Sequence, residues 1–345
     1  MRTHPRTRIR LAIHPVRGTT MLTCSLVLTG GLALALLAPA HPASAAPAPF
    51  RDPFVGFVLD QGRIERIDLP GNGNFTVLDG INNRGEITGK YPDADKPGYH
   101  GLLLDRYRKP TRIDYPGAAA TYANKSNDRG SIVGAANPSA PTIGTPGTVG
   151  YVLQHGKFTQ IRVPGAVETQ AFGINNRGQV VGEYQDQGGV YHGYRWQNGQ
   201  FTTFDGPDGT GASITDVNDR GDMVGVYAPA AGAVRGFVFH DGRYTTFAAG
   251  GLPLTFPFDI NNRGQIAGTT GNADLTEAHG FLLATGAGGP VTPIDIPGAP
   301  NTTAYGLDDH GRIVGIYDNP DPTPSAQQMP AGARPMGLGQ TMKTQ

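Results

Sequence analysis

The chain has 345 residues, among them 51 glycines, 29 prolines and a single cysteine. This composition, without helix-forming periods outside the first 45 residues, predicts many short strands and turns and almost no helix. Removal of residues 1–45 would take away five arginines and no acidic residue, leaving 23 basic against 28 acidic residues and a net charge of −5. Nucleic-acid and anionic-membrane surfaces both require a basic excess, so we expect neither partner.

Residues 1–45 have the order of a secretory signal peptide. The five arginines are followed by an apolar run from Met21 to Leu37 and then by the small residues Ala43-Ser44-Ala45. This order predicts cleavage near Ala45 and no stable membrane insertion afterwards, with an uncleaved anchor as the alternative. Cys24 lies inside the apolar run, so the exported chain would contain no thiol. We therefore expect a secreted, extracellular protein that starts with a linker at residues 46–53.

The rest of the chain repeats one unit six times, anchored by a four-residue turn that ends in glycine. These glycines are 45, 48, 43, 43 and 47 residues apart, and the turns are Asn82–Gly85, Asn127–Gly130, Asn175–Gly178, Asn218–Gly221, Asn261–Gly264 and Asp308–Gly311. Asn and Asp favour turns, and glycine accepts the positive φ of a hairpin turn. The spacing indicates a structural repeat of roughly 45 residues.

Each unit contains the pattern of four strands. A strand that opens on glycine, such as Gly193–Trp196, is followed by a tight turn such as Asn198-Gly199 and by a strand such as Phe201–Phe204. A third strand leads into the repeat turn, and a short apolar strand such as Gln179–Gly182 follows it. Two hairpins per unit predict four antiparallel strands.

The sequence therefore predicts an all-β fold, a six-bladed β-propeller of six four-stranded repeats over residues 54–318. A parallel β-helix is the alternative, but it would need shorter rungs. Because the first unit starts near Gly56 and the last ends near Tyr317, we expect the ring to close by packing of the end units, without strand exchange. The proline-rich residues 319–345 have no apolar period and are predicted to be disordered.

Three segments carry a family resemblance: His279–Leu283, Ile296–Ala299 and Gly173–Gln179. They resemble the extracellular HAF repeats of secreted bacterial proteins, and the resemblance extends over roughly residues 54–318. It implies secretion and a repeat fold, and it implies no established activity. The last turn departs from the pattern, because it reads Asp-Asp-His-Gly where the others have Asn first.

The strand order also predicts which end of the molecule binds a ligand. Both tight turns of each unit fall at one end, and the longer connections fall at the other, where binding residues are usually placed. Tyrosines and histidines flank these connections, as do single acidic and basic residues. The candidate ligand-binding residues are Tyr99, His100, Glu183, Tyr184, Tyr191, His192, Tyr227, Arg235 and His279.

Three alternatives involve charged groups or metals. A ring formed by His100, His192 and His279 could hold a metal, but a repeated histidine more often hydrogen-bonds a turn. The arginines of the repeat turns could form a basic ring for a polyanion, or pair with neighbouring acids. The segment Asp216–Asp222 resembles a calcium loop but lacks a distal glutamate, so turn chemistry explains it better. We expect no metal and no other cofactor.

The predicted function is a monomeric binding module for an extracellular carbohydrate, peptide or protein. We assign no catalytic residues, because no recognisable catalytic motif occurs. A propeller lyase or hydrolase with a channel metal is one alternative, and a structural component of the cell envelope is another.

Overall fold

A computed structural model describes residues 54–69, 75–92, 97–230 and 233–318. The predicted signal peptide (1–45), linker (46–53) and disordered tail (319–345) lie outside these ranges. Within them the fold is all-β: 24 strands and one 3₁₀ turn at Gly286–Gly288, with no α-helix. The expectation of many short strands is confirmed.

The strands associate in six antiparallel groups of four, each made of two hairpins. Group 1 contains β3 (Val77–Ile81), β4 (Ile87–Pro92), β5 (Tyr99–Leu104) and β6 (Pro110–Ile113). Group 2 contains β7 (Ala120–Ser126), β8 (Ile132–Asn137), β9 (Val149–Gln154) and β10 (Lys157–Ile161). Group 3 contains β11 (Glu168–Ile174), β12 (Val180–Gln185), β13 (Tyr191–Gln197) and β14 (Gln200–Phe204).

The other three groups repeat this arrangement. Group 4 contains β15 (Ala212–Val217), β16 (Met223–Ala230), β17 (Ala233–His240) and β18 (Arg243–Phe247). Group 5 contains β19 (Leu254–Ile260), β20 (Ile266–Gly271), β21 (Ala278–Leu283) and β22 (Val291–Ile294). A single parallel bridge between Val234 and Leu254 joins groups 4 and 5. Group 6 contains β23 (Thr302–Leu307), β24 (Ile313–Asp318), β1 (Phe54–Asp60) and β2 (Arg63–Ile67).

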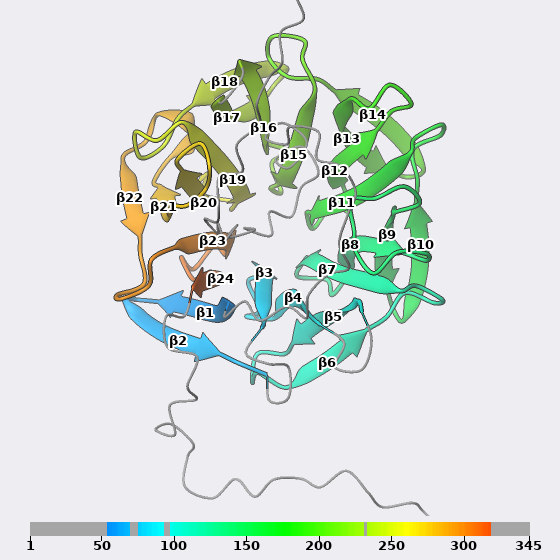
Figure 1. Ribbon diagram of the computed structural model, residues 1–345, viewed down its shortest axis with the longest axis horizontal. Helices are drawn as coiled ribbons and strands as arrows, with labels where there is room; N and C mark the ends of the chain where they lie inside the picture. The colour runs from blue at the N-terminus through cyan, green and yellow to red at the C-terminus, as the bar shows by residue number, and fades with distance from the viewer. Residues whose placement is uncertain (1–53, 70–74, 93–96, 231–232, 319–345) are drawn as a thin grey trace, which may run out of the picture.

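Figure 1 shows the groups side by side around a common centre, with the first strand of each hairpin pair innermost. The inner strands are also more deeply buried than the outer ones. The inner strands β7, β11 and β19 are buried at every residue, whereas the outer strand β14 has no buried residue. The arrangement is propeller-like, and it rules out the parallel β-helix.

Group 6 shows how the two ends of the chain meet. β1 pairs with β24 in antiparallel register, from Phe54 opposite Asp318 to Leu59 opposite Ile313. The expectation of closure without strand exchange is therefore wrong. The sequence repeat is offset by two strands from the sheets, so the first hairpin of the chain completes the sheet started by the last one. Backbone hydrogen bonds, rather than face packing alone, join the ends.

The tight turns form as predicted. In the turn after β11, Gly178 has a φ of +76° and its N–H donates to the Asn175 carbonyl at 3.1 Å. The Asn175 side-chain oxygen accepts from the backbone N–H groups of Arg177 and Gln179, each at 3.0 Å. At the second turn Asn198 and Gly199 both have positive φ, at 52° and 83°. This is the backbone conformation of a two-residue hairpin loop.

Each inner strand carries a register shift that the sequence pattern did not predict. In β11 the shift lies between Ala171 and Gly173, and the same position is shifted in the other five inner strands. A β-bulge of this kind re-aims the side chains that follow it. The centre of the molecule is consequently lined in layers, one residue from each group.

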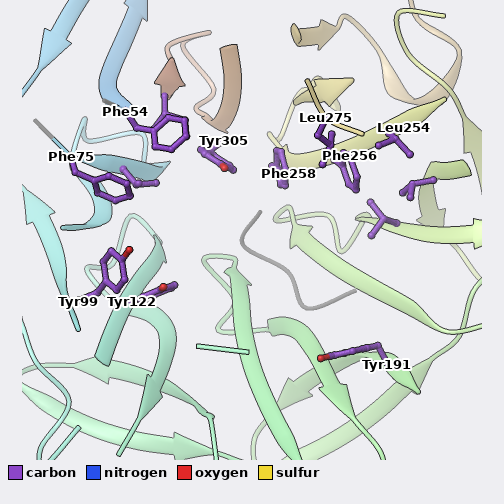
Figure 2. Close-up of a cluster of buried hydrophobic side chains, with 14 residues drawn as sticks. Phe54, Phe75, Tyr99, Tyr122, Tyr191, Leu254, Phe256, Phe258, Leu275 and Tyr305 are labelled. Atoms are coloured by element: carbon purple, nitrogen blue, oxygen red, sulfur yellow. The ribbon is translucent and has the colours of Figure 1, made fainter. Parts of the chain in front are cut away.

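The largest apolar cluster lies toward the end with the longer connections and draws on all six groups. It includes Phe54, Phe75, Tyr99, Tyr122 and Phe256. Figure 2 shows its labelled side chains distributed around the centre, with Tyr191 on the group 3 side. Phe54 meets Phe75 edge-on at 5.8 Å, and Tyr99 meets Tyr122 in the same way at 5.4 Å. This core spans the groups instead of lying within any one of them.

Candidate functional site

The end that carries the tight turns is closed by a ring of alternating amides and carboxylates. The second residues of the six turns are, in order, Asn83, Asp128, Asn176, Asp219, Asn262 and Asp309. Each backbone N–H in the ring donates to the side-chain Oδ1 of the next residue, at 2.7–2.9 Å. The Nδ2 group of each asparagine donates to both flanking carboxylates, at 2.8–3.1 Å. The alternation satisfies every one of these groups, which requires an even number of turns.

One turn departs from the pattern and is compensated locally. In five turns the first residue is asparagine, and its Nδ2 donates to the carbonyl of the equivalent residue in the next group. The sixth has Asp308, which lacks that donor. Arg312 holds the Asp308 carboxylate at 2.5 Å and donates to the Asn83 carbonyl at 3.3 Å instead. The unusual sixth turn therefore still links to the first group.

Below the ring lies a buried ion triad across the centre. The Lys125 ammonium lies 3.1 Å from Asp216 and 2.9 Å from Asp259, which come from groups on the far side. Burial alone would lower the pKa of Lys125, but the two carboxylates outweigh it and raise that pKa. The residue that follows the register shift is Lys125, Asp216 or Asp259 in groups 2, 4 and 5 and glycine in the other three groups. A Cβ at Gly173 would come within 2.4 Å of the Asp216 carboxylate. These charges hold groups together at the centre.

The turn arginines surround this ring as exposed side chains, with His310 at the sixth position. Arg84 pairs with Glu86 at 2.6 Å and Arg220 with Asp222 at 2.8 Å. Pairing with neighbouring acids is thus confirmed for two arginines. The acids expected to do this, Asp128 and Asp219, instead belong to the closed ring. Asp222 belongs to its own repeat turn, as expected, and accepts from Asn218 at 2.9 Å.

The predicted binding residues lie at the opposite end but do not converge on one point. They occupy the facing ends of the second and third strands in four different groups. Side chains alternate along a strand, so Tyr99 and Tyr191 are turned toward the core while their neighbours His100 and His192 lie on the other face. The sequence therefore identified equivalent positions, and not a single site.

The three core tyrosines are unavailable as an exposed binding surface. Tyr99, Tyr191 and Tyr227 are each 7–8% exposed. The Tyr191 hydroxyl donates to Glu168 at 2.8 Å, and Tyr227 packs against Phe237 at 6.3 Å. Because all three side chains are buried, they present little surface to a ligand that approaches from solvent. Arg235 is likewise engaged, donating to the Pro253 carbonyl at 2.8 Å.

Each predicted histidine pairs with an aspartate that follows the outer strand of its own group. The Nδ1 atoms of His100, His192 and His279 lie 2.7, 2.5 and 2.9 Å from Asp114, Asp205 and Asp295. Each of these aspartates directly precedes a turn, so the histidines bond the residue before the turn and not the turn itself. In His279 the hydrogen bond to Asp295, aided by Glu277, raises the pKa. Among the described residues no group of three or more His, Cys, Asp and Glu side chains is arranged to hold a metal.

Group 3 has an accessible cluster beside its histidine. The Tyr184 ring stacks on His192, with centroids 5.2 Å apart and planes at 25°. His192 bridges Asp205 and Asp186, whose side chains are 46% and 40% exposed. The Tyr184 hydroxyl lies 3.3 Å from the hydroxyl of Thr203. We call Tyr184, His192, Asp186, Asp205 and Thr203 the rim cluster.

Further charged groups are buried beside the inner strands, and of these only Glu183 was among the predicted binding residues. Lys90 is fully buried and binds both Asp79 carboxylate oxygens at 2.7 and 2.9 Å. Burial lowers the pKa of Lys90 and raises that of Asp79. Glu183, predicted to face a ligand on the surface, is also fully buried and accepts from Gln170 at 3.2 Å. One signal in the sequence could have indicated these buried charges. Lys90 and Glu183 occupy a strand position at which the other four repeats have Val, Ile, Ala or Thr.

Comparisons with known proteins give the fold only. No family model matches the chain, and no curated protein matches it in sequence. The chain is structurally similar to a protein from Agrobacterium tumefaciens that has been provisionally named TolB. The TM-score is 0.59 at 13% sequence identity. The match covers 78% of this chain and 99% of that one. TolB from Acinetobacter baumannii has a TM-score of 0.49 at 12% identity, over 77% of this chain and 63% of that one.

A lectin is a more distant structural match. The Aleuria aurantia lectin, in complex with a fucosyl-N-acetylglucosamine disaccharide, has a TM-score of 0.43 at 11% identity. The match covers 70% of this chain and 87% of the lectin.

In the part of this chain that the structure describes, no helix is long and apolar enough to cross a membrane.

Proposed function

We propose that this protein is a secreted carbohydrate-binding module, a six-bladed β-propeller of the HAF-repeat type that binds its ligand at the long-connection end. The signal-like order of residues 1–45 supports export. The six groups of four strands and the six-membered turn ring support six blades. The opposite end is occupied by that closed hydrogen-bond ring, which leaves the long connections as the adaptable surface.

The rim cluster is the observation that supports a carbohydrate as the ligand. Asp186 and Asp205 are partly exposed acceptors held in place by one imidazole, and an aromatic ring lies beside them. Fixed carboxylates accept hydrogen bonds from adjacent sugar hydroxyls, and an aromatic side chain supplies apolar area at a small entropy cost. An acidic cluster favours a neutral or amino sugar over an acidic one.

A glycan array followed by calorimetry tests this function. Wild type should bind a neutral or amino sugar, and Asp205→Asn and Tyr184→Ala should each weaken that binding about tenfold or more, as expected for a loss of ~1.4 kcal/mol. Asp295→Asn in group 5 is the matched control, because the same His–Asp pair there lies opposite Thr270 and not a tyrosine. It should leave affinity unchanged.

Two results would overturn the proposal. One is a glycan signal that none of the rim variants alters. The other is selective binding to a peptide array with no glycan signal, which would make the module a peptide binder.

A further inference from the structure

Group 1 contains a second copy of the tyrosine, histidine and aspartate that form most of the rim cluster. Tyr91 on β4 is directly opposite His100 on β5, in the register that the rim tyrosine and histidine have in group 3. Asp114 directly follows β6, as the rim aspartate that binds Nδ1 follows β14. Groups 1 and 3 are separated by group 2 (Figure 1). The repeat therefore places the same three residue types at equivalent positions in two groups.

The geometry of the two sets is also similar. The ring centroids of Tyr91 and His100 are 5.3 Å apart with planes at 53°, compared with 5.2 Å and 25° in the rim cluster. The Nδ1 atom of His100 lies 2.7 Å from Asp114, compared with 2.5 Å for the rim pair. The Asp114 side chain is 43% exposed and its rim counterpart 46%. Solvent thus reaches, in both groups, a carboxylate that is held by an imidazole beside an aromatic ring.

The fold does not require this combination of side chains. Group 5 has the His279–Asp295 pair, but Thr270 is opposite its histidine. Groups 2, 4 and 6 have no histidine at this position, where the residues are Val149, Arg235 and Val55. Among the six described groups, only groups 1 and 3 therefore have the tyrosine, the histidine and the aspartate together. Four groups form the same sheet without them, so packing of the sheet does not explain the combination.

Group 1 differs from the rim cluster beside the aspartate. Arg112 on β6 takes the place that Thr203 has on β14. Its Nε atom donates to Asp114 Oδ2 at 2.5 Å, while His100 binds Oδ1. A carboxylate has about four lone-pair positions, so Asp114 can still accept hydrogen bonds, but one position is occupied by the arginine. The loss of one acceptor position corresponds to about tenfold lower affinity than at the rim cluster.

We propose that group 1 forms a second carbohydrate site, in which Tyr91 and Asp114 bind a neutral or amino sugar of the class proposed for the rim cluster. This inference rests on the proposed function. Tyr91 supplies apolar area and Asp114 accepts from sugar hydroxyls, with His100 as the positioning residue. Both sites lie at the long-connection end, so one glycan-coated surface can meet both. The protein would then hold such a surface more tightly than it holds a free monosaccharide.

Histidine NMR of the full chain tests the two sites separately. Glucose, galactose, mannose and glucosamine are titrated one at a time while the ring-proton resonances of His100, His192 and His279 are followed. We expect His192 to respond first and His100 at about tenfold higher concentration of the same sugar. The His279 resonance should not move, because group 5 has the same His–Asp pair without the tyrosine.

Variants assign the second response to group 1. Tyr91→Ala and Asp114→Asn should each abolish the response of His100 and leave that of His192 unchanged. Asp114→Asn keeps the shape of an exposed side chain, so the fold is retained even if Tyr91→Ala loses packing. Both variants should also bind a surface densely coated with the same sugar about tenfold or more weakly than wild type. Asp295→Asn is the matched control and should change neither measurement.

The outcomes separate this site from the proposed function. A response of His192 alone in the wild-type protein overturns the second site and leaves the rim cluster as the single site. A response of His100 that persists in both group 1 variants also overturns the second site. If neither histidine responds to any of the four sugars, the second site and the proposed function are both wrong.

Discussion

The two ends of the molecule are built from the same repeats, yet they differ in how much variation they tolerate. At the tight-turn end, one residue from each group enters a cyclic network in which every donor and acceptor is matched. At the other end the equivalent positions differ between groups, as Tyr184 and Thr270 show opposite their histidines. Cyclic matching constrains all six repeats together, whereas separate loops leave each free to change. We therefore expect mutations at the first end to act on stability and those at the second on binding.

The largest expected effect concerns the closure of the ring. Deletion of residues 54–67 removes β1 and β2 and exposes the edge of β24, so we expect loss of the folded monomer. Circular dichroism and size-exclusion chromatography would measure this. A permutant opened between Leu69 and Phe75, with Asp318 linked to Phe54, should fold, because these two residues are cross-strand partners. A stable, monomeric deletion variant would contradict the closure described here.

The ion triad should give the next largest effect. Lys125→Met leaves Asp216 and Asp259 buried without their cation, and we expect a loss of about 3–5 kcal/mol in the free energy of unfolding. Urea denaturation at neutral pH measures it. Adding Asp216→Asn and Asp259→Asn should recover most of the loss, since no buried charge then remains. If the single variant is as stable as wild type, the triad is not a source of stability.

Breaking the alternation of the turn ring should lower the free energy of unfolding by less than loss of the ion triad does. Asn176→Asp removes two amide hydrogens and places three carboxylates side by side, so we expect a loss of about 1–3 kcal/mol at neutral pH. Exchanging all six residues, Asn for Asp and Asp for Asn, preserves the alternation and serves as the control. Equal destabilisation by the single and sixfold changes would show that alternation is unimportant.

The smallest effect is expected at His279. Its pKa is raised in the folded protein, so its pairing stabilises the fold fully below about pH 6.5 and is lost as pH rises through the folded value. Asp295→Asn should therefore cost well under ~1 kcal/mol, and only on the acid side, because the pair is partly exposed. Melting temperatures between pH 5 and pH 8 would show it. A difference that is constant across this range would exclude the protonated pair as its cause.

Local chemistry explains why so much of the fold could be predicted. Asn175 and Gly178 determine their turn through contacts within five residues, and Asn198-Gly199 determines the second hairpin in the same way. The spacing of such turns then predicted the number of repeats and the end at which the long connections lie. The histidines also make local contacts, because each pairs with an aspartate of its own group, 13 to 16 residues further along the chain.

The sequence by itself determined the strands, the turns and their periodicity, because these depend on residues close together in the chain. Only the tertiary structure decided how the ends join, since β1 and β24 are separated by nearly the whole domain. It also decided that Tyr99 and Tyr191 face the core, and that Lys125 meets acids from two distant groups. The ion triad and the pairing of β1 with β24 join residues 91 or more positions apart, and no local pattern encodes which of them will meet.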